Sequence, residues 1–190
     1  MQSLYTILIT DRNGSTIADV TDMCKKRRYV RRRNRPENIE LAFDIDDLRR
    51  YLIGSRNTAD ELLRTNSNEV HIYRGDSQIV AGQIIYRDVA AADSKSVTIQ
   101  AAGWLQMLAH RYTGIGVDYL ATDIGMIMWD LIDVAQAVAN GDMGITQGTI
   151  QASRLAERNT YDFKNIKDAI IQLSEVINAP DFSFTPDKAF

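Results

Sequence analysis

Apolar residues in the first hundred positions recur with a period of two, which is typical of strands that bury one face. Residues 39–43, for example, read Ile-Glu-Leu-Ala-Phe. The same pattern, together with β-branched and aromatic runs, predicts further strands at residues 4–10, 16–20, 70–73, 78–86 and 97–100. Glycine-containing segments at 11–15 and 74–76 predict the turns of two hairpins. Gly82, inside a predicted strand, indicates a bulge or a close approach of backbone.

The spacing of apolar residues changes to that of α-helices after residue 112. Apolar residues from Leu120 to Val138 follow one another at intervals of four and three, which predicts one long helix with an apolar stripe. A second helix is predicted from Ile166 to Ile177, ending before Pro180. Alternation over 181–185 predicts one more strand. In the first half, Asp46 is expected to cap a short helix, and another short helix is expected after residue 103.

These elements predict an α+β fold in two parts. Residues 1–112 are expected to form a strand-rich, β-barrel-like module with short inserted helices. Residues 113–190 are expected to form a smaller, helix-rich α/β part. The length of 190 residues, 45% of them hydrophobic, suits one domain or two small ones. The sequence contains no apolar run of 18 residues, so we expect this segment not to insert into a membrane.

The net charge of −3 conceals an uneven distribution of charged residues. Residues 1–35 carry nine Lys or Arg and three Asp, whereas residues 36–190 carry thirteen basic and twenty-two acidic residues. Positive charge is densest between positions 25 and 35. We call residues 25–35 the basic segment. We take its basic side chains as candidate interface residues: Lys25, Lys26, Arg27, Arg28, Arg31, Arg32, Arg33 and Arg35.

Three interpretations of this basic segment are open. It could contact an acidic protein surface, bind nucleic acid, or form an exposed edge strand whose arginine stems cover apolar surface. We favour a protein interface, because arginine is enriched at interfaces and pairs bidentately with carboxylates. The acidic remainder of the chain offers such carboxylates if copies assemble head to tail, which makes a ring physically reasonable. The alternative is a nucleic-acid-binding module that uses residues 25–35.

No pattern in the sequence indicates catalysis. His71 and His110 have no His or Cys at the spacing of a metal site, and no metalloprotease, nucleophile-elbow or P-loop motif occurs. Cys24 is the only cysteine and is interpreted as a small structural thiol. We therefore predict no catalytic, cofactor-binding or metal-binding residues and no cofactor, and an enzyme is the least supported class of function.

The order of these segments resembles the N-terminal part of tail-hub, or baseplate-hub, proteins of tailed bacteriophages and the related minor tail proteins of prophages. The resemblance covers nearly the whole chain, and its motifs are strand patterns and turn dipeptides. They lie at Asp11–Gly14, Arg33–Pro36, Val70–Asp76, Ile79–Ile84, Val97–Leu105, His110–Tyr112, Asn140–Ile145 and Asn165–Ile170.

This resemblance implies a structural protein of the virion. Members of the family form a trimeric ring at the distal end of the tail tube, which joins the distal tail protein to the central fibre or spike. DNA passes through the lumen of that ring. We therefore expect a homotrimer that contacts the distal tail, tape measure and fibre or spike proteins. The expected location is the tail tip, after assembly in the bacterial cytoplasm. Family members continue beyond this segment, so the 190 residues are expected to be the front portion of a longer hub chain.

Overall fold

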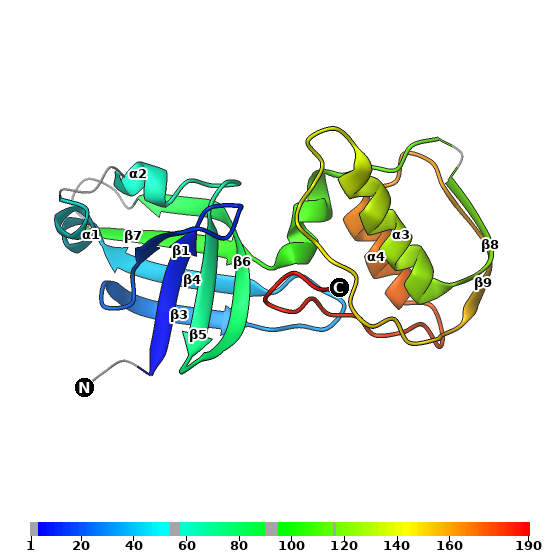
Figure 1. Ribbon diagram of the computed structural model, residues 1–190, viewed down its shortest axis with the longest axis horizontal. Coiled ribbons are helices and arrows are strands. Elements are labelled where there is room, and N and C mark those ends of the chain that lie inside the picture. The colour runs from blue at the N-terminus through cyan, green and yellow to red at the C-terminus, as the bar shows by residue number, and fades with distance from the viewer. Residues whose placement is uncertain (1–3, 54–57, 90–94, 116) are drawn as a thin grey trace. The chain divides into compact units, whose positions relative to one another are not determined.

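The computed structural model describes residues 4–53, 58–89, 95–115 and 117–190, which form two compact units (Figure 1). The first unit runs to Arg31 and resumes over Glu37–Gly103. The second unit comprises Arg32–Pro36 and Trp104–Phe190. Strands dominate the first unit, while helices and a short ribbon make up the second, so the predicted α+β class is confirmed. The division of the chain into domains at residue 112 stays a prediction.

The strands described in the first unit form one antiparallel sheet with the order β2-β1-β5-β6-β7-β4-β3. The strands are β1 (Tyr5–Thr10), β2 (Thr16–Asp19), β3 (Cys24–Val30), β4 (Asn38–Asp44), β5 (Glu69–Arg74), β6 (Ser77–Val89) and β7 (Ser96–Ala102). Two short helices, α1 (Ile45–Tyr51) and α2 (Ala59–Leu62), follow β4. Each strand predicted in this half is present. The basic segment also contains a strand, β3, which ends at Val30.

The apolar side of this sheet forms the core of the first unit. Ile39, Leu41 and Phe43 of β4 are buried as their alternation predicts, and they pack with the apolar residues of β1, β5, β6 and β7. The sheet coils around this side (Figure 1). As a result, Arg27 of β3 lies over the ring of Tyr5 in β1, 4.2 Å from its centroid, although β1 and β3 are not neighbours in the strand order. The sheet therefore has the barrel-like form that the sequence predicts.

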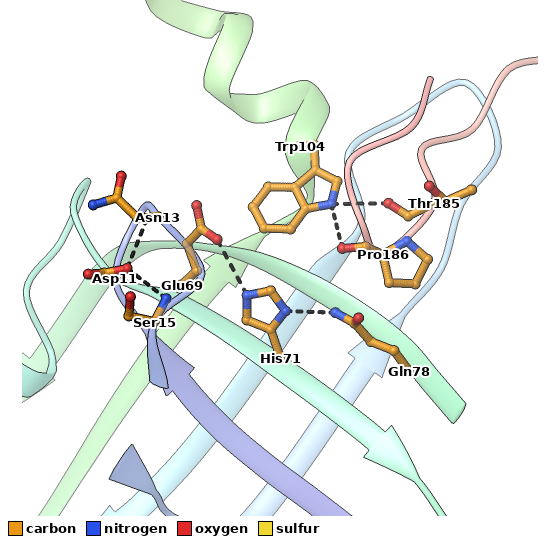
Figure 2. A network of polar contacts seen from close by, with 9 residues as sticks. All are labelled: Asp11, Asn13, Ser15, Glu69, His71, Gln78, Trp104, Thr185 and Pro186. Carbon is orange, nitrogen blue, oxygen red and sulfur yellow. Dashed lines mark hydrogen bonds and ion pairs between the residues drawn. The ribbon is translucent and has the colours of Figure 1, made fainter. Parts of the chain in front are cut away.

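Both predicted hairpins are present, and local hydrogen bonds set their turns. In the turn between β1 and β2, the carboxylate of Asp11 accepts hydrogen bonds from the backbone N–H groups of Asn13 and Ser15, both at 2.9 Å (Figure 2). Gly14 supplies the left-handed conformation, with φ of 79°. Gly75 does the same between β5 and β6, with φ of 58°.

Gly82 lies where two backbones meet, as predicted. The first half of β6 pairs with β5 and its second half with β7. At Gly82 a β-carbon would lie 2.4 Å from the carbonyl oxygen of Ala102 in β7. The irregular pairing of β6 with β7 falls slightly later, between Ile84 and Tyr86. Glycine is therefore required by the close approach of β7.

The cap of α1 corrects one prediction. Its N-cap is Asp44, whose carboxylate accepts from the backbone N–H groups of Asp46 and Asp47 at 2.8 and 3.2 Å. Asp46 itself is the second residue of the helix. Three acidic residues in four positions all suit the positive end of a helix, so composition alone could not separate the cap from its neighbours.

The second unit contains a 3-10 helix, η1 (Trp104–His110), two α-helices and a ribbon of two strands among its described residues. The elements after η1 are β8 (Val117–Asp123), α3 (Ile124–Ala137), β9 (Leu155–Tyr161) and α4 (Ile166–Ser174). Helix α4 packs against both α3 and η1. Strands β8 and β9 pair only with each other in the part of the chain described. The buried core of the unit includes Leu105, Leu108, Ile127, Leu131, Ile132, Ile170 and Leu173.

Three predictions for this half are wrong in detail. The long helix begins at Ile124 and not at Leu120, which lies in β8 with 75% of its surface exposed. Its position four residues before Ile124 matches helical spacing by coincidence. The second helix ends at Ser174, which leaves Ile177 exposed. Residues 181–185 alternate in burial, but they form no strand. Phe182 instead packs near Phe190.

Asp123 fixes the start of α3 and links it to a distant loop. Its carboxylate accepts from the backbone N–H groups of Gly125 and Met126 at 2.8 and 3.3 Å. It also accepts from the N–H and hydroxyl groups of Ser153 at 2.5 and 3.0 Å. Burial alone would raise the pKa of Asp123, but these hydrogen bonds outweigh burial and hold the pKa below its usual value.

We expect Asp123→Ala to lower the free energy of unfolding by about 1–2 kcal/mol at pH 7. Because the pKa of Asp123 is lower in the folded state than in the unfolded state, its contribution to the free energy of unfolding is complete above the unfolded pKa. That contribution is lost as pH falls through the folded pKa. Urea unfolding at pH values from about 7 to 2, compared with Asp123→Asn, measures both effects. An acid dependence that is identical in wild type and Asp123→Asn would contradict this role.

Candidate interaction surface

The basic segment begins on β3, an edge strand of the seven-stranded sheet. On one side β3 pairs with β4, in a register that places Arg27 opposite Leu41 and Arg28 opposite Glu40. Because Leu41 is buried and side chains alternate between faces, Arg27 lies on the inner side of the sheet and Arg28 on the outer side.

Arg27 links the edge strand β3 to β1. Its guanidinium lies over the face of Tyr5, a cation–π arrangement. An inward-facing charge of this kind is one way in which an edge strand is kept from pairing with other chains. Arg27 therefore serves the fold, whichever partner the outer side meets.

Three further cations of the segment pair with carboxylates within the first unit. The pairs are Lys25–Asp47 at 2.7 Å, Lys26–Glu40 at 2.8 Å and Arg31–Glu37 at 3.0 Å. The hydrogen bond with Asp47 raises the pKa of Lys25, and the same contact lowers the pKa of Asp47. Lys26 likewise lowers the pKa of Glu40. All three basic partners are largely exposed, so these pairs neutralise charge more than they stabilise the fold.

Glu37 is the most enclosed of these acidic partners. Burial raises its pKa, and the contact with Arg31 opposes that shift only in part. Its backbone carbonyl also accepts a hydrogen bond from the N–H of Gly103 at 3.0 Å. Arg31 is therefore the partner of a half-buried carboxyl group. If Arg31 moved to another contact, the carboxylate of Glu37 would lose its cation, which would destabilise the fold.

The end of the basic segment belongs to the second unit. Arg33 lies 3.4 Å from Asp181, and Arg35 lies 2.6 Å from Glu175. Between them, the side-chain amide of Asn34 donates to Asp181 at 2.8 Å and its oxygen accepts from the N–H of Phe182 at 2.7 Å. The structure thus divides the candidate residues between two units.

Among the described residues, three candidates form no ion pair with a carboxylate, and one of them, Arg27, lies over the ring of Tyr5. Arg28 and Arg32 are exposed, and neither forms an ion pair within the described ranges. Of the eight candidates, these two have neither an ion pair nor a cation–π contact in the described part of the chain. The acidic partners of the paired cations lie between 6 and 148 positions away along the chain, so no local sequence pattern indicates them.

The histidines and the cysteine occupy separate environments. His71 lies 3.3 Å from the carboxylate of the buried Glu69 and 2.6 Å from the amide of Gln78 (Figure 2), while His110 is exposed at the end of η1. The thiol of Cys24 donates to the carbonyl of Lys26 at 3.1 Å, and burial raises its pKa, which favours the unreactive protonated form.

Among the described residues no three His, Cys, Asp or Glu side chains gather as metal ligands, and no helix is long and apolar enough to cross a membrane.

Comparison with known proteins shows what this fold is similar to. Neither a protein-family model nor a curated protein sequence matches the chain. Among solved structures, the 43 kDa tail protein of prophage MuSo2 from Shewanella oneidensis aligns with a TM-score of 0.60 and 10% identity, over 97% of this chain and 52% of that one. The tail protein from Neisseria meningitidis MC58 gives a TM-score of 0.59 and 7% identity, over 98% and 49%.

A third similar structure comes from a different assembly. A chain of the Francisella PdpA–VgrG complex aligns with a TM-score of 0.54 and 16% identity, over 90% of this chain and 28% of that one. At these identities the likeness is one of fold. The resemblance to phage tail proteins is confirmed at that level, and the chain spans about half the length of the two tail proteins.

Proposed function

We propose that this chain is a structural component of a phage tail tip or baseplate hub. In this role, three copies form a ring that links the tail tube and the distal tail protein to the central fibre or spike. The tape measure protein is a further contact, and DNA passes through the lumen. The observation that carries the proposal is the likeness of fold to two tail proteins, over 97% and 98% of the chain.

Nucleic acid is the less favoured partner for the basic segment. Five of its eight cations lie within 3.4 Å of a carboxylate of the same chain. Binding to phosphates would have to break these pairs, whereas phosphate affinity comes from cations that are free to displace the counterions condensed on the nucleic acid. Arg28 and Arg32 alone offer few such contacts.

Self-association of the purified chain tests the proposal. Sedimentation equilibrium over a wide range of concentration is expected to show a trimer, because a ring of copies requires contact between them. Electron cryomicroscopy of the chain expressed with the tube and distal tail proteins of the same phage should place density for it at the distal end of the tube. A monomer that binds neither protein would overturn the proposal.

Filter binding with duplex DNA tests the alternative function, a nucleic-acid-binding module that uses residues 25–35. We expect weak binding whose dependence on salt is shallow between about 50 and 200 mM, because few cations are available for phosphates. A steep dependence that Arg28→Glu and Arg32→Glu reduce would favour the nucleic-acid module. Arg33 is unsuitable for this test, since reversing its charge would also break its contact with Asp181.

A further inference from the structure

Helix α3 is more apolar than a helix with one solvent-facing side requires. Among its fourteen residues only Asp130, Asp133 and Gln136 are polar. Its inner side packs in the core of the second unit, yet Met126 and Val134 on the other side are 45% and 37% exposed. The exposed side of α3 therefore presents apolar side chains to solvent, with the exposed Asp130 and Asp133 among them.

The charge of this side of α3 is wholly negative. Residues 112–153 contain five Asp and no Lys or Arg. Asp130 and Asp133 form no ion pair in the described part of the chain, and Asp133 is exposed. Asp130 accepts a hydrogen bond from the hydroxyl of Tyr119 in β8. Burial, and then this contact, raise the pKa of Tyr119. We call the side chains of Met126, Asp130, Asp133 and Val134 the α3 face.

The outer side of β3 has the opposite composition. Residues 24–35 contain eight Lys or Arg and no acidic residue. Arg28 lies near the centre of β3 on the outer side, and no carboxylate pairs with it in the described ranges as Glu40 pairs with Lys26. Val30 follows on the same side, two residues along the strand. A cation beside an apolar side chain is complementary to carboxylates beside apolar side chains.

We propose that the α3 face binds the outer side of β3 of a second copy of this chain, with Arg28 of one copy between Asp130 and Asp133 of the next. The inference rests on the proposed function and names the contact that joins copies within the ring. It commits to a second copy because the chain carries both surfaces, and the charged side chains of each, Arg28 on one and Asp130 and Asp133 on the other, form no ion pair in the described ranges. Two different surfaces make a head-to-tail contact, which closes into a ring if the rotation between copies permits.

A charge-exchange experiment on the full chain tests this contact. Arg28→Glu places a negative charge opposite Asp133, and Asp133→Arg places a positive charge opposite Arg28. Each single variant is therefore expected to weaken self-association by about tenfold or more, because like charges then meet at the contact. The double variant restores opposite charges and is expected to return to within a few-fold of wild type. Sedimentation equilibrium measures all four proteins.

Matched controls come from the exposed turn between β5 and β6. Arg74→Glu and Asp76→Arg make the same charge changes on residues that form no ion pair within the described ranges, and they should leave self-association unchanged. Arg28→Glu would also place a second carboxylate opposite Glu40, and Arg28→Gln removes the positive charge without doing so. Thermal unfolding verifies that each variant folds.

Zero-length carbodiimide cross-linking gives an independent measurement. In a mixture of unlabelled and ¹⁵N-labelled copies, mass spectrometry should find Lys26 joined to Asp130 or Asp133 in peptides of mixed label. Cross-links only within one label, or a double variant no better than the sum of the single ones, would overturn the α3 contact even if wild type forms trimers. If wild type neither self-associates nor binds tail proteins, the proposed function itself fails.

Discussion

Replacing Gly82 by alanine is expected to lower the free energy of unfolding by about 3 kcal/mol, at the upper end of the cost of overpacking. The added methyl group would lie 2.4 Å from the carbonyl oxygen and 2.7 Å from the carbonyl carbon of Ala102. Both are backbone atoms of β7, so no flexible side chain can move aside. Either β6 and β7 separate or their hydrogen bonds bend. Urea unfolding followed by far-ultraviolet circular dichroism measures the loss.

Gly114→Ala is the matched control for this substitution. A β-carbon at Gly114 would have no neighbour within 4 Å, and Gly114 is not among the glycines with positive φ. It should change stability by no more than about 0.5 kcal/mol, as expected for a surface position. Equal stability of Gly82→Ala and Gly114→Ala would show that the backbones of β6 and β7 are not held as closely as described.

Trp104→Ala is expected to cost about 3–5 kcal/mol, the range for removing a large buried aromatic side chain. The side chain is 1% exposed, and its indole N–H donates to the carbonyl oxygens of Thr185 and Pro186 at 3.1 and 3.2 Å (Figure 2). The substitution opens a cavity beside η1 and frees the segment that follows Phe184. Chemical unfolding gives the free energy, and limited proteolysis should show earlier cleavage near residues 185–190.

Trp104→Phe separates packing from hydrogen bonding. It keeps most of the buried ring and loses the N–H donor, so it should cost about 1–2 kcal/mol and less than alanine does. If phenylalanine and alanine were equally harmful, the hydrogen bonds to the C-terminal segment would matter more than the volume of the ring.

The strands of the first unit are predictable because most of them bury one face. Alternation in β4 alone is enough to identify Ile39, Leu41 and Phe43 as core residues, and all three are buried. Strand β8 gives a weaker signal, because the apolar Leu120 occupies an exposed position where the alternation of Val117, Asp118 and Tyr119 would place a polar residue. Leu120 therefore joins the helical pattern by its spacing alone, whereas the cap at Asp123 marks where the helix begins.

The candidate surface is predictable in composition and not in arrangement. Eight cations in eleven positions are visible in the sequence. Their acidic partners are not visible in the sequence. Glu40 lies beside Lys26 because of the register of β3 and β4, and Asp181 lies beside Arg33 although 148 positions separate them in the chain. Only once these pairs are known do Arg28 and Arg32 stand out as exposed cations that form no ion pair among the described residues.

The membership of residues 32–36 in the second unit has a consequence for dissecting the protein. The chain leaves the first unit after Arg31, returns at Glu37 and leaves again after Gly103, so three covalent crossings join the two units. A protease that cuts one crossing does not release either unit. A truncation at residue 103 would also remove Asp181 and Glu175, the partners of Asn34 and Arg35. The two units therefore cannot be separated by one cut without losing contacts within the second unit.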